Sequence, residues 1–189
     1  MMEFLPSHDI NVSPWKEQYP SEAEAKFKIA HDGNRICVLF ECTTDEIRNM
    51  NTSDQSPVSD DSCVEVFLEP CAGDEYRNLE VNYCGAINAS HRRSRKESTR
   101  MTPDELSRVW TFRRNAPTNT DNGKYRWLQY ICAPFDLIGI EYYEGKQIRG
   151  NVYACAAKAS KPYFLCWNPI DTQSPDYHRP EYFGTMELQ

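Results

Sequence analysis

Several recognisable catalytic motifs are missing from this sequence. It has only eight glycines and four histidines, and it contains no Gly-x-Ser-x-Gly elbow, no glycine-rich phosphate loop and no His-Glu-x-x-His pair. Serine-hydrolase, phosphoryl-transfer and zinc-protease chemistry therefore have no recognisable scaffold in this chain. No apolar run approaches the ~20 residues that a membrane-spanning helix needs.

Positive charge is also scarce relative to negative charge. The chain has 21 basic and 28 acidic side chains, and its net charge is −7. Because this charge repels phosphate backbones and anionic lipid headgroups, we expect neither nucleic acid nor a membrane as a partner. The one basic cluster, residues 91–96 (HRRSRK), is predicted to be a solvated loop.

The cysteines include no Cys-x-x-Cys pair, and most of them lie inside apolar, strand-like runs. This pattern predicts reduced thiols in the core of a cytoplasmic protein, with disulfides as the alternative. The first residues, MMEFLPSHDINVSPW, lack the basic and apolar regions of a secretion signal, which supports the same location. If the natural chain is longer, we expect an extracellular or periplasmic protein instead. The eight cysteines are Cys37, Cys42, Cys63, Cys71, Cys84, Cys132, Cys155 and Cys166.

Strand signals recur along the chain with turn residues between them, and helical periodicity is nearly absent. This predicts an all-β fold, an antiparallel β-sandwich of the jelly-roll or immunoglobulin-like kind, with at most one or two short helices. The length fits a single domain over residues 1–189. The expected strands are residues 26–30, 35–42, 63–69, 78–86, 124–132 and 151–159, with a further strand-like TMEL at the C-terminus.

Local turn chemistry predicts hairpins and short helices at particular places. Asp32-Gly33 and Asn122-Gly123 offer the positive φ that tight turns require, so hairpins are expected at residues 31–34 and 121–124. Thr102 followed by Pro103 is a helix start, which predicts a short helix over residues 102–108. Residues 134–139 are expected to form a turn or one helical turn after a strand.

Three long stretches carry no regular pattern, namely residues 43–59, 90–121 and 167–181. Irregular stretches of this length are unusual in a compact domain, and they are commonly functional when they are ordered. We therefore expect any binding site to lie near them.

Polar residues share one face of two consecutive predicted strands. If Val64, Val66, Leu68, Leu79, Val81 and Tyr83 face the core, then Glu65, Glu80 and Asn82 lie on the outer face of the sheet. Carboxylate and amide groups beside aromatic rings are typical of sugar recognition, because they bond hydroxyl groups while the rings stack on apolar sugar faces. The alternative is that Glu65 is an exposed strand residue paired with a cation.

The segment FLCWNPIDTQSPDYHRPEYFGTMEL concentrates aromatic and basic side chains in a proline-rich stretch. Such side chains are typical of recognition surfaces that lose little entropy on binding. The alternative is a loop that folds back over one end of the sandwich. The residues concerned are Trp167, Tyr177, His178, Arg179, Tyr182 and Phe183.

Two other kinds of site are weaker alternatives. A glycoside hydrolase needs a pair of carboxylates, for which Glu41, Glu65, Glu69 and Glu80 are available, but the sequence does not place two of them across a sugar. The pairs Asp60-Asp61, Asp32 with Asn34, and Asp121-Asn122 offer oxygen ligands for a structural calcium ion. Turn capping is the favoured explanation for these Asp and Asn residues, and no cofactor is expected.

In order along the chain, six segments resemble the family 9 carbohydrate-binding modules and the related DOMON-like sandwich domains. They are AKFKIAHDGNRICVLFECTTDE, SDDSCVEVFLEP, YRNLEVNYCGAI, RWLQYICAPFDLIG, RGNVYACA and PDYHRPEYFGTMEL, which span most of residues 20–188. The resemblance implies a β-sandwich that binds soluble saccharides between two aromatic rings and nearby polar groups, with calcium in some members. It also implies that Glu65 and Asn82 contact the sugar and that Trp167, or an aromatic residue within 177–183, forms one wall of the clamp.

One departure from the resemblance concerns the second aromatic wall. Where sugar-binding members of the family place a tryptophan just before the acidic strand, this sequence has Pro57-Val58-Ser59. Either binding is weaker, or another ring takes the place beside Ser59, or the ligand differs.

The leading hypothesis is a non-catalytic module that binds a saccharide or polyol. Its predicted site is a polar sheet face together with the C-terminal aromatic loop. The main alternative is an interaction domain of the same fold that has lost sugar binding and uses the aromatic loop for a protein partner. The predicted ligand-binding residues are Glu65, Asn82, Trp167, Tyr177, His178, Arg179 and Tyr182.

Overall fold

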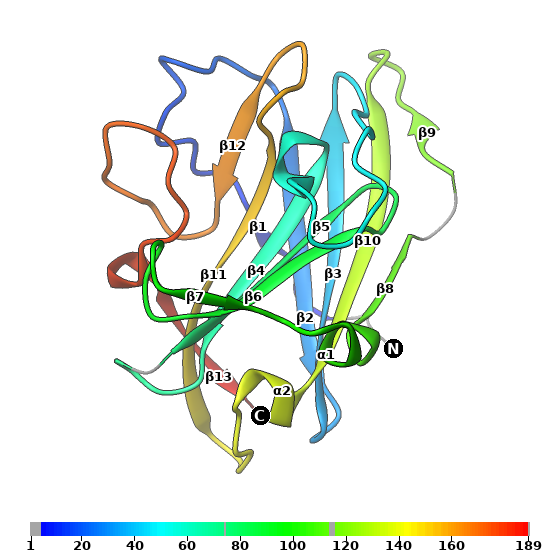
Figure 1. Ribbon diagram of the computed structural model, residues 1–189. Coiled ribbons are helices and arrows are strands. Elements are labelled where there is room, and N and C mark those ends of the chain that lie inside the picture. Colours follow the sequence, from blue (N-terminus) through cyan, green and yellow to red (C-terminus); the bar gives the residue numbers. More distant parts are fainter. Residues whose placement is uncertain (1–4, 74, 114–115, 189) are drawn as a thin grey trace.

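The computed structural model describes residues 5–73, 75–113 and 116–188 of the chain. Within these residues the strands form two antiparallel sheets, and only two short α-helices occur, which confirms the all-β sandwich (Figure 1). No helix in this part of the chain has the length and apolarity needed to cross a membrane.

The first sheet has the order β1-β2-β3-β10-β8, and β9 also pairs with β10. The strands β3 and β10 form its centre, and their register runs from Arg35 opposite Pro134 to Thr44 opposite Tyr125. The strand bounds are β1 His8–Asp9, β2 Glu24–His31, β3 Arg35–Thr44, β8 Trp110–Arg113, β9 Thr118–Asn119 and β10 Tyr125–Pro134.

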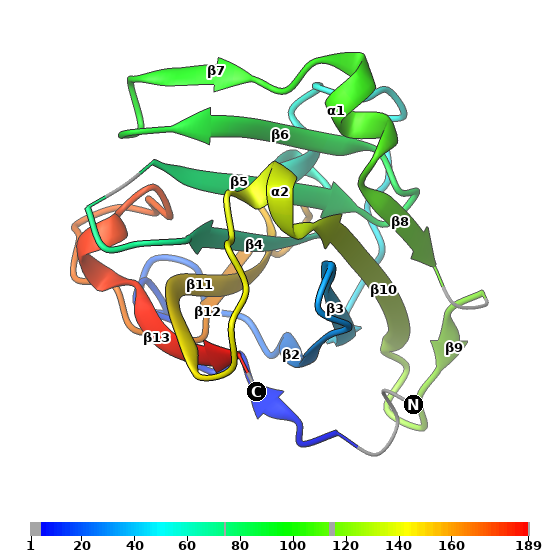
Figure 2. The ribbon, with the colours of Figure 1, turned by 90° about the horizontal axis from the view of Figure 1, so that it is seen from below.

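The second sheet has the order β12-β11-β4-β5-β6-β7, and β13 also pairs with β11. Figure 2 shows β4 to β7 side by side in this sheet. Its central strand β4 lies between β11 and β5. The strand bounds are β4 Cys63–Glu69, β5 Tyr76–Asn82, β6 Ile87–Arg92, β7 Ser98–Arg100, β11 Lys146–Ala156, β12 Tyr163–Cys166 and β13 Gly184–Leu188.

The core lies between the two sheets and follows from strand alternation. The predicted inward-facing residues of β4 and β5 are all buried in it, among them Val64, Val66 and Leu79, each 1% exposed or less. Phe40 and Trp127 contribute from the first sheet. Each such side chain removed from water contributes about 1.5–3 kcal/mol, so this alternation stabilises the sandwich.

The predicted turns and short helices are confirmed. Gly33 and Gly123 have positive φ values of 85° and 75° in the β2–β3 and β9–β10 hairpins. Thr102 is the N-cap residue of the helix α1, Pro103–Ser107, and its side chain accepts a hydrogen bond from the Glu105 backbone N–H. The single turn α2, Phe135–Ile138, follows β10.

The expected strand limits and loops need three corrections. The strand predicted over 78–86 ends at Asn82, because Gly85 has a positive φ of 94° and the chain turns there into β6. The strand predicted over 151–159 is β11, Lys146–Ala156. The stretch 90–121 is not irregular: it contains β7, α1, β8 and β9, whose segments are too short to show a period.

The prediction that all cysteines are reduced is wrong for one pair. Cys37 and Cys132 are joined by a disulfide. They are direct partners in the β3–β10 register, a relation that their separation of 95 residues conceals in the sequence. Cys42, Cys63, Cys155 and Cys166 are buried thiols as predicted, whereas Cys71 and Cys84 are exposed.

Candidate functional site

The polar residues of β4 and β5 lie on the outer face of the second sheet. Glu65 is opposite Glu80 on β5 and opposite Tyr153 on β11, and Asn82 is opposite Cys63. This confirms the predicted shared face, but the face is covered: Glu65 is 2%, Glu80 4% and Asn82 0% exposed. The alternative that Glu65 is an exposed strand residue is therefore wrong.

The C-terminal segment and residues 12–19 cover this face and form a second apolar cluster with it. The Tyr177 ring stacks on Tyr153 with centroids 4.0 Å apart. The Tyr153 hydroxyl donates a hydrogen bond of 3.1 Å to the Tyr177 carbonyl, and Trp15 Nε1 donates one of 2.8 Å to the Thr172 carbonyl. In Figure 1 the C-terminal segment, orange to red, lies beside β11 and β12. The segment therefore folds back, as one of the two sequence interpretations expects, but it covers the outer face of the second sheet and not one end of the sandwich.

A cavity of about 420 Å³ opens between the sheet and its cover. Glu65, Glu80 and Cys155 contribute to its lining from the strands. Besides Ser59, Ala157 and Pro175, the rest of the lining consists of aromatic rings and charged groups. These are Tyr19, Phe164, Tyr177, Arg95, Asp176 and His178.

The two carboxylates of the cavity differ in their hydrogen bonding. Glu80 accepts from Asn78 Nδ2 at 2.8 Å and from Asn88 Nδ2 at 3.0 Å, so both of its oxygens are occupied. Glu65 Oε1 accepts from the Cys155 thiol at 3.3 Å, whereas Oε2 has no hydrogen-bond partner among the residues that the structure describes. Glu65 Oε2 is therefore the oxygen available to a ligand.

Burial changes the acidity of both carboxyl groups. Desolvation raises the pKa of Glu65 well above its ordinary value, and the adjacent Cys155 and Glu80 raise it further. Desolvation also raises the pKa of Glu80, although the hydrogen bond from Asn88 opposes this change. Two such groups on one buried face disfavour each other's ionised form, so the floor of the cavity carries less negative charge than two free carboxylates would.

Asp176 organises the charged side of the cavity. Its Oδ1 atom accepts a hydrogen bond of 2.6 Å from Arg95 Nη1 and one of 3.1 Å from the His178 backbone N–H. Arg95 comes from the β6–β7 hairpin and Asp176 from the C-terminal segment, so this ion pair joins two stretches far apart in the sequence. Arg95 belongs to the basic cluster that the sequence predicts to be a solvated loop.

His178 is held as a neutral ring inside the cover. It stacks on Phe67 with centroids 4.9 Å apart, and its Nδ1 lies 3.2 Å from the Tyr76 hydroxyl. Burial, reinforced by Arg92 and Arg95 and opposed by Asp176, lowers the pKa of His178 to about 3. In the unfolded chain this ring takes up a proton near its ordinary pKa of about 6.5.

We expect His178 to make the stability of the fold sensitive to mild acid. Because the pKa of His178 is lower in the folded than in the unfolded chain, its contribution to the free energy of unfolding is fully present above about pH 6.5. This contribution is lost as the pH falls toward about 3. Urea unfolding at about pH 7.5 and about pH 5 should show a loss of about 2 kcal/mol in the wild type that the His178→Gln variant lacks. Parallel losses in both proteins would show that His178 is protonated in the fold.

The other predicted site residues lie outside the cavity lining. Asn82 Nδ2 donates to the Asn51 carbonyl at 2.7 Å and to Asp61 Oδ2 at 3.1 Å, which fastens the stretch before β4. Trp167 faces the core between the two sheets, where its ring packs edge-on against Phe27 with the ring centroids 5.7 Å apart.

Arg179 and Tyr182 also lie beside the cavity and not in it. Arg179 pairs with Glu181 at 2.8 Å and lines an adjoining hollow of about 470 Å³ that shares Arg95, Asp176 and His178 with the cavity. The Tyr182 hydroxyl donates to the Asp171 carbonyl at 3.0 Å. Of the predicted residues, the structure thus brings Glu65, Tyr177 and His178 together.

Sequence reasoning missed four of the aromatic and charged lining residues. Tyr19 lies in an N-terminal stretch without strand or helix periodicity, and Arg95 lies in a basic cluster that suggested a solvated loop. Phe164 alternates with the buried Tyr163 and Leu165 of β12, a strand too short to recognise. Asp176 stands beside the aromatic residues that the sequence singled out, and it carried no signal of its own.

A larger hollow of about 670 Å³ lies elsewhere on the molecule and lacks the features of a sugar site. Its charged lining residues include Lys16, Lys26, Glu41 and Lys124, and no aromatic ring is among the described residues that line it. Without a ring, this hollow offers a pyranose no stacking surface.

The acidic residues considered for calcium serve local structure. Asp32 Oδ1 accepts hydrogen bonds from the backbone N–H groups of Asn34 at 2.9 Å and Arg35 at 2.8 Å. These two bonds lower the pKa of Asp32. Asp61 Oδ2 accepts from the Asn51 backbone N–H at 2.7 Å. Turn capping accounts for Asp32, whereas Asp61 ties the stretch before β4 to the sheet. A structural calcium ion stays an untested alternative.

The fold and the cavity together define a β-sandwich binding module. The sequence matches carbohydrate-binding family 9 over residues 1–188, and the chain belongs to that family. Among curated proteins, none matches the chain significantly.

Solved structures give the same architecture. A protein from Bacteroides uniformis ATCC 8492, provisionally described as carbohydrate-binding, superposes with a TM-score of 0.89 at 27% identity, over 99% of this chain and 88% of that one. A family 9 module from Caldicellulosiruptor kristjanssonii in complex with glucose superposes with a TM-score of 0.66 at 18% identity, over 100% of this chain and 86% of that one. A family 9 module from the same organism in complex with cellotriose superposes with a TM-score of 0.64 at 18% identity, over 100% of this chain and 84% of that one.

Proposed function

We propose that this protein binds a saccharide, without chemical conversion, in the cavity between the second sheet and its C-terminal cover. The observation that carries the proposal is Glu65 Oε2, an oxygen without a described hydrogen-bond partner, on a residue that is 2% exposed and lines the cavity together with Tyr19 and Phe164. A buried acceptor of this kind gains most when a ligand hydroxyl reaches it. Membership of a carbohydrate-binding family supports the same function.

The lining suits a sugar of small size. Its volume of about 420 Å³ falls within the ~300–1000 Å³ that is usual for small-molecule sites. The rings of Tyr19 and Phe164 offer apolar surface for sugar C–H groups, and Asp176, Arg95 and Glu65 offer partners for hydroxyls. Because Tyr19 and Ser59 line the same cavity, Tyr19 is our candidate for the ring that replaces the absent tryptophan.

A binding role is favoured over hydrolysis by the arrangement of the carboxylates. Glycoside hydrolases place two carboxyl groups on either side of the scissile bond. Here Glu65 and Glu80 are direct neighbours on adjacent strands of one sheet face, and Glu80 is held by two amide groups. The pair forms a surface beneath a ligand and does not flank one.

A protein-binding role for the aromatic loop has less support. An exposed cluster of Trp167, Tyr177 and Tyr182 without a cavity would favour it. Instead Tyr177 is 8% exposed and lines a cavity, and Trp167 packs against the core. These positions favour a small ligand.

Calorimetric titration with glucose and with cellotriose tests the proposed function. We expect binding with a dissociation constant in the millimolar range or tighter, equivalent to about 4 kcal/mol or more. Absence of heat with these and with a panel of other mono- and oligosaccharides at millimolar concentration would overturn the proposal.

Replacing Tyr19 with alanine should weaken sugar binding about fivefold or more. The variant removes one of the rings that line the cavity, and an aromatic contact of this kind is worth about 1 kcal/mol or more. Tyr143→Ala is the matched control, because Tyr143 is 61% exposed and lies outside the lining. Equal affinities of the two variants would remove Tyr19 from the site.

A further inference from the structure

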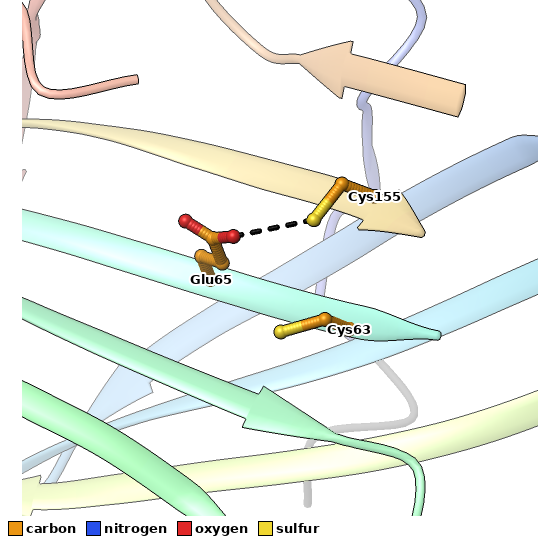
Figure 3. A group of neighbouring side chains, drawn as sticks. All are labelled: Cys63, Glu65 and Cys155. Atoms are coloured by element: carbon orange, nitrogen blue, oxygen red, sulfur yellow. Dashed lines mark hydrogen bonds between the residues drawn. The ribbon is translucent and has the colours of Figure 1, made fainter. Parts of the chain in front are cut away.

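Two thiols and a carboxylate meet on the outer face of the second sheet. Cys63 of β4 is the direct partner of Cys155 on β11, and Glu65 follows two residues later on the same face of β4. The two Sγ atoms and a carboxylate oxygen of Glu65 all lie within 4.8 Å of one another. Figure 3 shows the three side chains together, with Cys155 Sγ 3.3 Å from Glu65 Oε1.

These separations are close to those of a tetrahedral metal site. Zinc binds thiolate sulfur at about 2.3 Å and carboxylate oxygen at about 2.0–2.2 Å, so its ligand atoms lie about 3.5–3.8 Å apart. Small rotations of the three side chains bring them to that spacing. Thiolate ligands select zinc and other soft cations over calcium and magnesium.

The group lies on central, paired strands and still reaches the cavity. Cys63 is 0%, Cys155 1% and Glu65 2% exposed, and β4 is paired on both sides. Glu65, Cys155 and Ser59 line the cavity, which gives a cation a route in and leaves room for a fourth ligand such as water. Three protein ligands with one open position form an exchangeable zinc site, whereas four protein ligands form a closed structural one.

The other buried thiols lack this arrangement. Cys42 and Cys166 are equally buried, but neither joins a group of three potential ligands among the residues that the structure describes. Packing as small apolar side chains explains why those two cysteines are buried. It does not account for two cysteines in direct register beside a buried carboxylate in a polar cavity.

We infer that Cys63, Cys155 and Glu65 bind a divalent cation of the zinc class, with its fourth coordination position open to the cavity. This site goes beyond the proposed sugar binding. Binding forms two metal–sulfur bonds and one metal–oxygen bond. The proton of each thiol, and that of Glu65 where it carries one, passes to solvent.

Cobalt titration of the chain, with the Cys37–Cys132 disulfide kept and the other cysteines as free thiols, tests the inference. The parent carries Cys71→Ser and Cys84→Ser, because exposed thiols bind metal adventitiously. We expect one cobalt ion to bind per chain and to show the near-ultraviolet charge-transfer absorption of two thiolate ligands. Zinc should displace the cobalt ion. Cys63→Ser and Cys155→Ser should each weaken binding at least tenfold and halve that absorption, and the control Cys166→Ser should change neither. Unaltered binding in Cys63→Ser and Cys155→Ser, or no binding in the parent, would overturn the inference.

A second measurement needs no substitution at the site. Zinc should slow the alkylation of Cys63 and Cys155 in the reduced wild-type chain under mild denaturant, as followed by mass spectrometry, and it should leave Cys166 unaffected. Equal alkylation rates with and without zinc would contradict the site. Sugar titration of the metal-free chain reports on the proposed function separately.

Discussion

Replacing Arg149 with methionine should lower the free energy of unfolding by about 3 kcal/mol. Arg149 Nη1 donates a hydrogen bond of 2.6 Å to Glu69 Oε2, and its Nη2 donates to the Pro180 carbonyl at 2.9 Å. Glu69 is 2% exposed, so the variant leaves a carboxylate buried without its cation. It also releases the C-terminal cover at η3, Pro180–Tyr182, and sugar binding should weaken with it.

An exposed ion pair provides the control for Arg149. Arg126 pairs with Glu41 at 2.7 Å, and their side chains are 51% and 23% exposed. Arg126→Met should cost less than about 1 kcal/mol, as is usual for pairs in contact with water. Urea unfolding of both variants measures the difference. Equal losses would contradict a structural role of the buried pair, and Arg149→Met combined with Glu69→Met should recover part of the loss, because it removes the unpaired charge.

Replacing Glu65 with alanine should weaken sugar binding by about tenfold to a hundredfold. The reason is the loss of an acceptor, because a ligand hydroxyl left without its hydrogen bond in a desolvated site costs about 1–3 kcal/mol. The fold should persist, because the carboxyl group is buried at a desolvation cost and its described hydrogen bond comes only from the Cys155 thiol. Cooperative thermal unfolding of the variant checks this point.

The matched control for Glu65 lies in the larger hollow. Glu41 is a carboxylate of the same type that lines the hollow of about 670 Å³. Glu41→Ala should bind sugar as the wild type does. If Glu41→Ala loses affinity and Glu65→Ala keeps it, the sugar site is the larger hollow and our assignment is wrong.

Alternation along the strands made much of the fold predictable. Period two in residues 63–69 placed Val64, Val66 and Leu68 in the core and Glu65 on the outer face, and both placements are confirmed. The predicted hairpins and α1 also follow from local chemistry, because Gly33, Gly123 and Thr102 act through their own backbone or side chain.

What covers the outer face could not be predicted from alternation. A strand pattern shows which side a residue takes, but not whether another segment folds over that side. Glu65 is buried because residues 12–19 and the C-terminal segment pack on it, a contact between the two ends of the chain. The same limit explains why Tyr19 was missed. The Cys37–Cys132 disulfide was not expected for another reason, because its two cysteines are 95 residues apart and only the β3–β10 register brings them together.

Asn82 illustrates how the resemblance and the contacts differ. The resemblance implies that Asn82 contacts a sugar. In the structure its amide group bonds the Asn51 carbonyl and Asp61 Oδ2, which ties the long stretch before β4 to the sheet. A residue type suited to sugar hydroxyls suits a loop carbonyl equally well, and only the neighbouring atoms distinguish the two.

Chemical-shift mapping with a soluble saccharide tests the central claim most directly. In an isotope-labelled chain titrated with glucose or cellotriose, we predict saturable shifts at Tyr19, Glu65, Phe164 and residues 176–178, which the cavity brings together. Saturable shifts confined to the larger hollow around Glu41 and Lys124, or to the exposed rings of Trp110 and Phe112, would contradict the account.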